Sequence, residues 1–248
     1  MKLITKPGLW KWAHPNFLFG AALMALLLAT PAQAATLDKQ ILTFLEVEQL
    51  EYRFNDGRNS VNWDAQGWVG TDEHKVWMKT EGGRTSDGKY EDAEFQILYG
   101  RMISDFFDAE VGVRYDIKPE PRRGFFVLGL HGLAKQFFEV DGALFVSDDG
   151  DVSARLEAEY EVLLTQKLIA QASVETNIAA QTVRSNEVGT GFNDIEVGFR
   201  LRYEIRREFA PYIGLHWERK LGRTAAFAKD EGEGIDNLAF VTGIRFWF

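Results

Sequence analysis

Apolar and polar residues alternate with a period of two along most of the chain. Ile195–Ile205 reads IEVGFRLRYEI, with apolar side chains at the odd positions and charged residues or glycine between them. Ala154–Val162 (ARLEAEYEV) and Ala109–Ile117 (AEVGVRYDI) repeat this pattern, and Leu238–Phe248 follows it with Thr242 as its one polar break. Successive side chains of a β-strand point to opposite faces, so each segment is predicted to be a strand with one apolar face.

The predicted strands are long. Ile195–Ile205 and Leu238–Phe248 each span 11 residues, against about 5–6 for an average soluble strand and about 9–11 for a tilted strand that crosses a bilayer. The chain also ends on an aromatic-rich strand (RFWF), which is usual for bacterial outer-membrane barrels. Twelve strands are predicted, at 41–54, 61–70, 74–83, 91–102, 107–117, 124–135, 137–147, 152–164, 167–178, 192–204, 209–220 and 237–248.

The connections between these segments alternate in length. Those after even-numbered strands are tight, as at Thr71–Glu73 and Thr165–Gln166, whereas Ala179–Gly191 and Leu221–Asp236 are long and follow odd-numbered strands. Short turns on one side and longer loops on the other are typical of outer-membrane barrels, and a closed barrel leaves no strand edge in lipid. The fold is therefore predicted to be all-β, a transmembrane antiparallel β-barrel of about 12 strands. A soluble sandwich with an aromatic core is the alternative.

The first residues predict export. Three lysines precede an apolar run at Phe17–Ala29, and the sequence then reaches an Ala-x-Ala site that ends at Ala34. This is the pattern of a secretory signal peptide, and 13 apolar residues are few for the roughly 20 of a membrane-spanning helix, which is the alternative. We expect a signal peptide over 1–34, a short periplasmic segment over 35–44, and a barrel over 45–248 in the cell outer membrane.

Composition limits the function classes. The chain has no cysteine, which excludes disulfides and Cys-ligated zinc. Its net charge of −9 argues against a nucleic-acid partner, which requires a basic surface. Aromatic residues make up 13% of the chain, and those at strand ends and on apolar faces, Trp77, Phe125 and Trp247 among them, are expected to form girdles at the membrane interfaces.

Seven segments, spread over the predicted barrel, carry a resemblance to a known family: Gln49–Tyr52, Asn62–Gly70, Val76–Glu81, Ala154–Gln166, Leu201–Gly214, Trp217–Lys220 and Val241–Phe248. Together they resemble the outer-membrane copper resistance protein B family. The resemblance implies an outer-membrane β-barrel, embedded in lipid, that contributes to copper tolerance in Gram-negative bacteria, usually beside a periplasmic copper oxidase. Family members often carry a Met- and His-rich stretch before the barrel, whereas 35–44 (ATLDKQILTF) contains neither residue.

Two histidines are candidate ligands for a copper ion. His216 shares a strand face with Glu218, and this face is expected to point into the lumen, where imidazole and carboxylate together could bind a metal. His131 lies between Leu130 and Gly132, and the pattern does not decide which face it occupies. The alternative for each histidine is a lumenal side chain satisfied by water or by a neighbouring charge.

Three functions remain open. The expected one is copper resistance through binding or passing copper ions, and the first alternative is a general small channel without a metal role. The second alternative is a barrel hydrolase acting on lipid or peptide, which needs a nucleophile and a base within hydrogen-bond reach. The sequence places no serine near an outward-facing histidine, so no enzymatic activity is expected.

Overall fold

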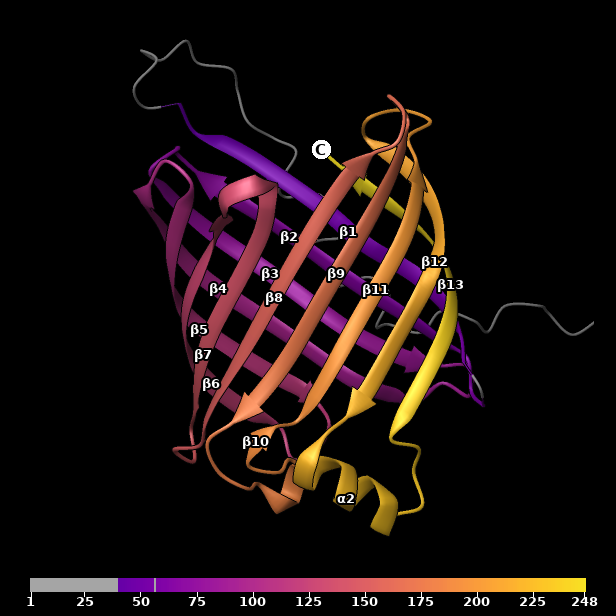
Figure 1. The fold of residues 1–248 in the computed structure, drawn as a ribbon. Helices are drawn as coiled ribbons and strands as arrows, with labels where there is room; N and C mark the ends of the chain where they lie inside the picture. Colours follow the sequence, from indigo (N-terminus) through magenta and orange to yellow (C-terminus); the bar gives the residue numbers. More distant parts are fainter. Residues whose placement is uncertain (1–39, 56) are drawn as a thin grey trace, which may run out of the picture. The chain divides into compact units, whose positions relative to one another are not determined.

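The computed structural model describes residues 40–55 and 57–248 and contains twelve long antiparallel strands. They are followed in Figure 1 from β1, in indigo, to β13, in yellow. Smaller elements are the two-residue β10 (Gly191–Phe192), the helix α2 (Gly222–Asp230) and 3-10 turns at Lys135–Phe137 and Arg184–Asn186. The long strands are β1 (Leu42–Phe54), β2 (Ser60–Gly70), β3 (His74–Thr85), β4 (Tyr90–Ser104), β5 (Phe107–Lys118), β6 (Arg123–Leu133), β7 (Phe138–Ser147), β8 (Val152–Leu163), β9 (Leu168–Ala179), β11 (Asp194–Tyr203), β12 (Phe209–Lys220) and β13 (Asp236–Trp247).

The sheet closes on itself. Each long strand pairs with two neighbours, and the ring is completed where β13 pairs with β1 and where β8 pairs with β9. At the seam, Phe248 N donates to Leu45 O at 2.8 Å and Leu45 N donates to Phe248 O at 2.9 Å. The predicted antiparallel barrel of about 12 strands is confirmed, because closure pairs the backbone of every long strand on both sides.

Tight turns and long loops lie at opposite ends of the barrel. The turns after β2, β4, β6, β8 and β11 share one end with the start of β1 and the end of β13, as predicted. The long connections after β9 and β12 carry β10 and α2 at the other end (Figure 1). The predicted signal peptide over 1–34 and residues 35–39 of the predicted segment 35–44 lie outside the described residues.

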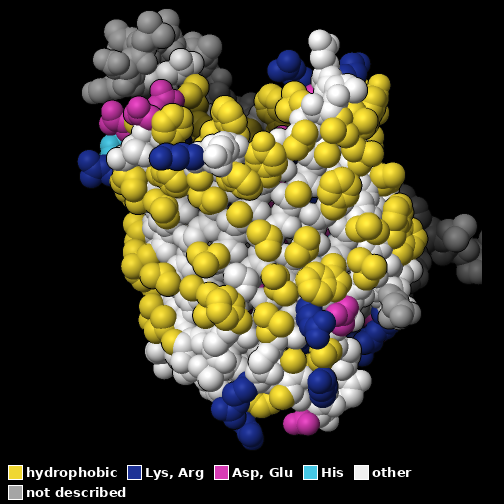
Figure 2. Space-filling view, viewed as in Figure 1, with side chains coloured by type: hydrophobic (Ala, Val, Ile, Leu, Met, Phe, Trp, Pro, Cys, Tyr) yellow, Lys and Arg dark blue, Asp and Glu magenta, His cyan; other side chains and the backbone are white. Residues whose placement is uncertain are grey.

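The outer wall is apolar because the outward phase of each strand is apolar. Side chains such as Ile97, Val113, Leu128, Phe199 and Phe240 are about half exposed on that face. Figure 2 shows hydrophobic side chains over the middle of the visible wall, with Lys, Arg, Asp and Glu toward its two ends. In the described part of the chain, no helix has the length and hydropathy needed to cross a membrane.

The predicted aromatic girdle was wrong for Trp77, Phe125 and Tyr212, which is 4% exposed. Trp77 and Phe125 are buried inside the barrel, 5% and 9% exposed, where they pack with Leu98, Val127 and Phe145. The reason is strand phase. Trp77 lies two residues from an inward lysine on either side, so alternation turns its ring into the lumen.

The predicted loop over 221–236 also contains a helix. Asn193 leaves the strand ladder between β10 and β11, and its side-chain amide donates to Gly189 O at 2.6 Å and to Thr224 Oγ1 at 2.8 Å. The backbone of Leu221, just before α2, donates to Asn193 O at 2.7 Å. These contacts tie the two long connections together at the loop end of the barrel.

Candidate functional site in the barrel lumen

Charged side chains reach the lumen because the strands that carry them alternate. Glu81 on β3 lies opposite Glu94 on β4, and Gln96 lies opposite Arg114 on β5, all in the inward phase. A buried charge is costly unless it is paired and hydrogen-bonded. The charged side chains that these strands turn inward therefore need ion-pair partners inside the barrel.

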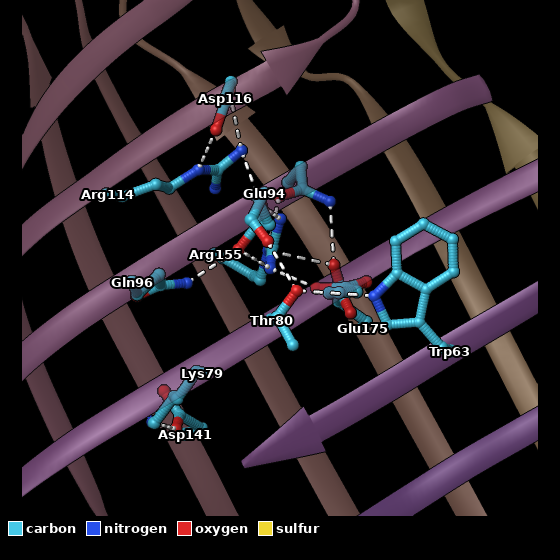
Figure 3. A network of polar contacts seen from close by, with 12 residues as sticks. Trp63, Lys79, Thr80, Glu94, Gln96, Arg114, Asp116, Asp141, Arg155 and Glu175 are labelled. Carbon is cyan, nitrogen blue, oxygen red and sulfur yellow. Dashed lines mark hydrogen bonds and ion pairs between the residues drawn. The ribbon is translucent and has the colours of Figure 1, made fainter. Parts of the chain in front are cut away.

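Arg155 on β8 binds three carboxylates (Figure 3). Its Nη1 lies 2.8 Å from Glu81 Oε2, its Nη2 lies 3.0 Å from Glu94 Oε2, and its Nε lies 3.2 Å from Glu175 Oε1. Glu175 belongs to the adjacent β9, but four strands separate β8 from β3 around the wall. The Arg155 side chain therefore spans the lumen from one wall to another.

Other ion pairs also cross the lumen. Lys79 Nζ on β3 lies 3.0 Å from Glu110 Oε2 on β5 and 3.1 Å from Asp141 Oδ2 on β7. Arg245 Nη1 on β13 lies 2.8 Å from Glu161 Oε1 on β8. These pairs join strands that do not hydrogen-bond to each other, so they stabilise the closed barrel through contacts across its lumen.

An aromatic wall lies beside the Arg155 network. Phe145 is 3% exposed, and its ring centroid lies 4.8 Å from Arg114 Cζ and 5.9 Å from Arg155 Cζ. Phe125 lies 5.2 Å from the same Arg114 carbon and packs edge-on against Phe145. Guanidinium groups held over ring faces are stabilised by the ring quadrupole, so the aromatic wall orients both arginines.

A second network surrounds Glu51 on β1. Its Oε2 lies 3.1 Å from Arg200 Nε, its Oε1 lies 2.7 Å from Arg53 Nε, and the Tyr212 hydroxyl donates to Oε2 at 3.1 Å. A bulge in β1 turns two consecutive side chains, those of Glu48 and Gln49, toward the same part of the lumen. Gln171 Nε2 donates to Glu48 at 3.2 Å, and Arg200 Nη2 donates to Gln49 at 2.7 Å.

An acidic cavity lies between these networks. It has a volume of about 890 Å³, counted with the solvent space at its opening, and Lys79, His131 and Arg155 are its basic lining residues. Four of its acids form no ion pair with a Lys, Arg or His of the described chain: Glu48, which accepts a hydrogen bond from the neutral Gln171, and Asp64, Glu157 and Glu159. The carboxylates that line it are Glu48, Asp64, Glu81, Glu94, Glu110, Glu139, Asp141, Glu157 and Glu159.

The candidate ligands predicted from the sequence lie on two different walls. His131 on β6 lines the acidic cavity, with Nδ1 3.4 Å from Asp141 Oδ2. His216 and Glu218 are on β12, and four strands separate that strand from β6. Over residues 40–55 and 57–248, no three His, Asp or Glu side chains are grouped closely enough to hold a metal ion.

His216 is hydrogen-bonded to the cationic side chain of Arg53. It is 4% exposed, and its Nε2 lies 3.0 Å from Arg53 Nη1 and 3.4 Å from Glu196 Oε2. Because a guanidinium only donates hydrogen bonds, Nε2 is the accepting nitrogen toward Arg53. Glu218 faces the lumen opposite Glu196 in the strand register.

Several residues of the lumen networks were not singled out from the sequence. Glu51, Glu175 and Asp141 each hold a central position in an ion-pair network. Glu175 and Asp141 follow the period-two phase of their strands, so alternation alone was enough to place them inside, whereas Glu51 points inward only because the bulge in β1 shifts the phase. Alternation does not indicate which inward charges they meet, because partners such as Arg200 for Glu51 lie far away along the chain.

Comparison with known proteins identifies relatives over the whole barrel. The model of a family described as copper resistance protein B precursor matches residues 41–248. The chain is 43% identical over 211 residues to a protein named copper resistance protein B from Escherichia coli, covering 85% of this chain and 71% of that protein. A copper resistance protein B homolog from Pseudomonas syringae pv. tomato is 37% identical with the same coverage.

Among solved structures, the NanC porin shares the fold. The two chains superpose with a TM-score of 0.53 at 12% sequence identity, over 82% of this chain and 98% of the porin. At this identity the likeness concerns the barrel architecture alone.

Proposed function

Since the chain belongs to the copper resistance protein B family, we propose that it is an outer-membrane protein that contributes to copper tolerance by binding or passing copper ions in its lumen. The observation that carries this proposal is the acidic cavity. Asp64, Glu157 and Glu159 line it without ion-paired partners in the described chain, and such carboxylates attract cations.

The chemistry of the lining favours Cu(II). Carboxylate oxygens and imidazole suit this ion, whereas Cu(I) is selected by thiolates and thioethers. Residues 40–248 contain no cysteine and only two methionines, Met78 and Met102. His131 is the imidazole that a copper ion would meet in the acidic cavity, and His216 with Glu218 would offer a second position on the β12 wall.

The surroundings of the barrel follow from the same proposal. The apolar outer wall is suited to outer-membrane lipid, and the predicted signal peptide over 1–34 would direct export. A periplasmic copper oxidase is the proposed partner at the end that carries the tight turns. Family and fold together support a non-enzymatic role.

Copper tolerance of cells tests the function. A copper-sensitive Gram-negative strain that expresses the chain should grow at higher copper concentrations than the same strain with an empty vector. Replacing the three carboxylates together (Asp64→Asn, Glu157→Gln, Glu159→Gln) should remove most of this gain. The matched control is Glu231→Gln with Glu233→Gln, which neutralises acids beyond α2 and should leave tolerance unchanged.

Two outcomes would contradict the proposal. Equal tolerance with the chain and with the empty vector would show that it plays no part in copper resistance. Equal tolerance with both sets of variants would show that the cavity is not where copper acts. His131→Asn and His216→Asn, measured by copper titration of the purified barrel, then report which wall binds the ion, and unchanged binding in both would exclude the histidines.

A channel without a metal role is the second candidate. The absence of a three-ligand group within the described residues favours it, because a dedicated copper site usually holds its ligands in place. Conductance of the purified barrel in a planar bilayer separates the two candidates. A current that copper leaves unchanged favours the channel, and a current that micromolar copper alters favours the copper protein.

A further inference from the structure

We propose that the Arg155 side chain partly closes the lumen, which restricts the flow of ions, and lowers the preference of the passage for cations. The proposal rests on the proposed function in one respect, namely that the lumen is the route of passage. It assigns a specificity-determining role to one residue of that route.

The first argument is geometric. The Arg155 guanidinium uses all three of its nitrogens, toward Glu175 on its own side and toward Glu81 and Glu94 on the far wall. Figure 3 shows two of these acceptors, Glu94 and Glu175, reaching Arg155 from different strands. Charge-assisted contacts to several carboxylates fix the side chain in one position across the lumen.

The second argument is the aromatic wall beside this side chain. Phe145 packs within 5.9 Å of Arg155 Cζ, and Trp77, Leu98 and Val127 continue the same apolar cluster into the lumen. An ion moving past Arg155 on this side would leave water for an apolar surface, which is costly.

The third argument is electrostatic. The positive charge of Arg155 neutralises part of the field of Glu81, Glu94 and Glu175, next to the unpaired acids of the cavity. A passing cation meets that charge at short range. With the guanidinium removed, Glu81 and Glu175 would lose their ion-pair partner and Glu94 would keep Arg114 alone, at 2.7 Å, so the same level would carry a net negative charge, which favours cations.

Single-channel recording of the barrel purified from outer membranes, in KCl without copper, tests the proposal. Arg155→Ala should raise the conductance several-fold and raise the permeability of K⁺ relative to Cl⁻. Glu81→Gln, which changes the charge in the opposite direction but removes a contact of Arg155, should also raise the conductance while lowering the K⁺ preference. Arg219→Ala, a loss of positive charge from a half-exposed site near the loop end, should change neither quantity.

The two lumen variants together separate closure from net charge. If Arg155→Ala raises the conductance and Glu81→Gln lowers it, only the net charge matters and the proposal is wrong. If neither variant differs from the unmodified barrel, Arg155 does not close the passage. Resistance of the unboiled barrel to SDS shows whether each variant has folded. If Arg155→Ala does not fold, Arg155→Lys replaces it in the test. This variant keeps the charge but loses the three-way contact, and its conductance should lie between that of the unmodified barrel and that expected for Arg155→Ala.

These recordings are independent of copper tolerance. Altered conductance in the Arg155 variant, together with equal copper tolerance of cells that express the chain and cells with the empty vector, would reject the copper function and keep the role of Arg155. Unaltered conductance, together with lost tolerance in the carboxylate variants, would reject the role of Arg155 alone.

Discussion

Replacing Glu51 with glutamine should lower the free energy of unfolding of the barrel by about 3–5 kcal/mol, the usual cost of leaving a buried charge without its partner. The Glu51 side chain is fully buried against Arg200 and Arg53, at 3.1 Å and 2.7 Å. Glutamine can keep one hydrogen bond, but it removes the counter-charge. The Arg200 side chain, 3% exposed, would then retain Gln49 at 2.7 Å as its nearest acceptor, which is neutral.

Chemical unfolding of the barrel in lipid vesicles measures this loss, with tryptophan fluorescence as the signal and linear extrapolation to zero denaturant. Glu233→Gln is the control, because its pair with Lys220, at 3.0 Å, is exposed and should contribute about 0–1 kcal/mol. Arg200→Met completes a double-mutant cycle. The double variant should lose less than the sum of the two single variants, because it removes both charges together.

Two results would refute this reasoning. A loss of under about 1 kcal/mol for Glu51→Gln, no larger than that of an exposed pair, would show that Arg53 and Arg200 do not depend on this carboxylate. Strict additivity in the cycle would show that Glu51 and Arg200 are not energetically coupled despite their contact.

Three further predictions concern assembly and packing. Gly112→Ala should sharply reduce the fraction of the barrel that resists SDS, because the new Cβ would overlap Ile97 O and lie 2.7 Å from Leu98 Cα. The control is Gly142→Ala, which should assemble normally because the nearest neighbour of its Cβ would be Leu156 Cδ2, at 3.4 Å. Phe145→Ala should cost about 3–5 kcal/mol in unfolding free energy as a buried aromatic truncation, and an equal loss for the lipid-facing Leu144→Ala would contradict this. Deleting Phe248 removes two seam hydrogen bonds, at 2.8 and 2.9 Å and about 1 kcal/mol each, and should lower the yield of folded barrel on refolding into vesicles; an unchanged yield would show that the seam does not need them.

The strands and their faces could be predicted from the sequence. The alternation in Ile195–Ile205 placed Val197 and Phe199 on the outer wall and Arg200 and Arg202 inside, where the structure has them. This works because side-chain direction in a strand is a local property with a period of two. A membrane also demands that the backbone of each strand be paired, so one class of fold accommodates twelve such segments.

The partners inside the barrel could not be predicted. Arg155 meets Glu81 across 74 residues of sequence, and Arg200 meets Glu51 across 149. Alternation says that these side chains point inward, but strand tilt and the bulge in β1 decide the level at which each one lies. Local alternation along the chain is therefore enough to predict the barrel, its apolar outer wall and its charged lining. Which charges pair across the lumen, and which acids remain unpaired, follows from the folded barrel, because pairing depends on distances that exist only once the sheet has closed.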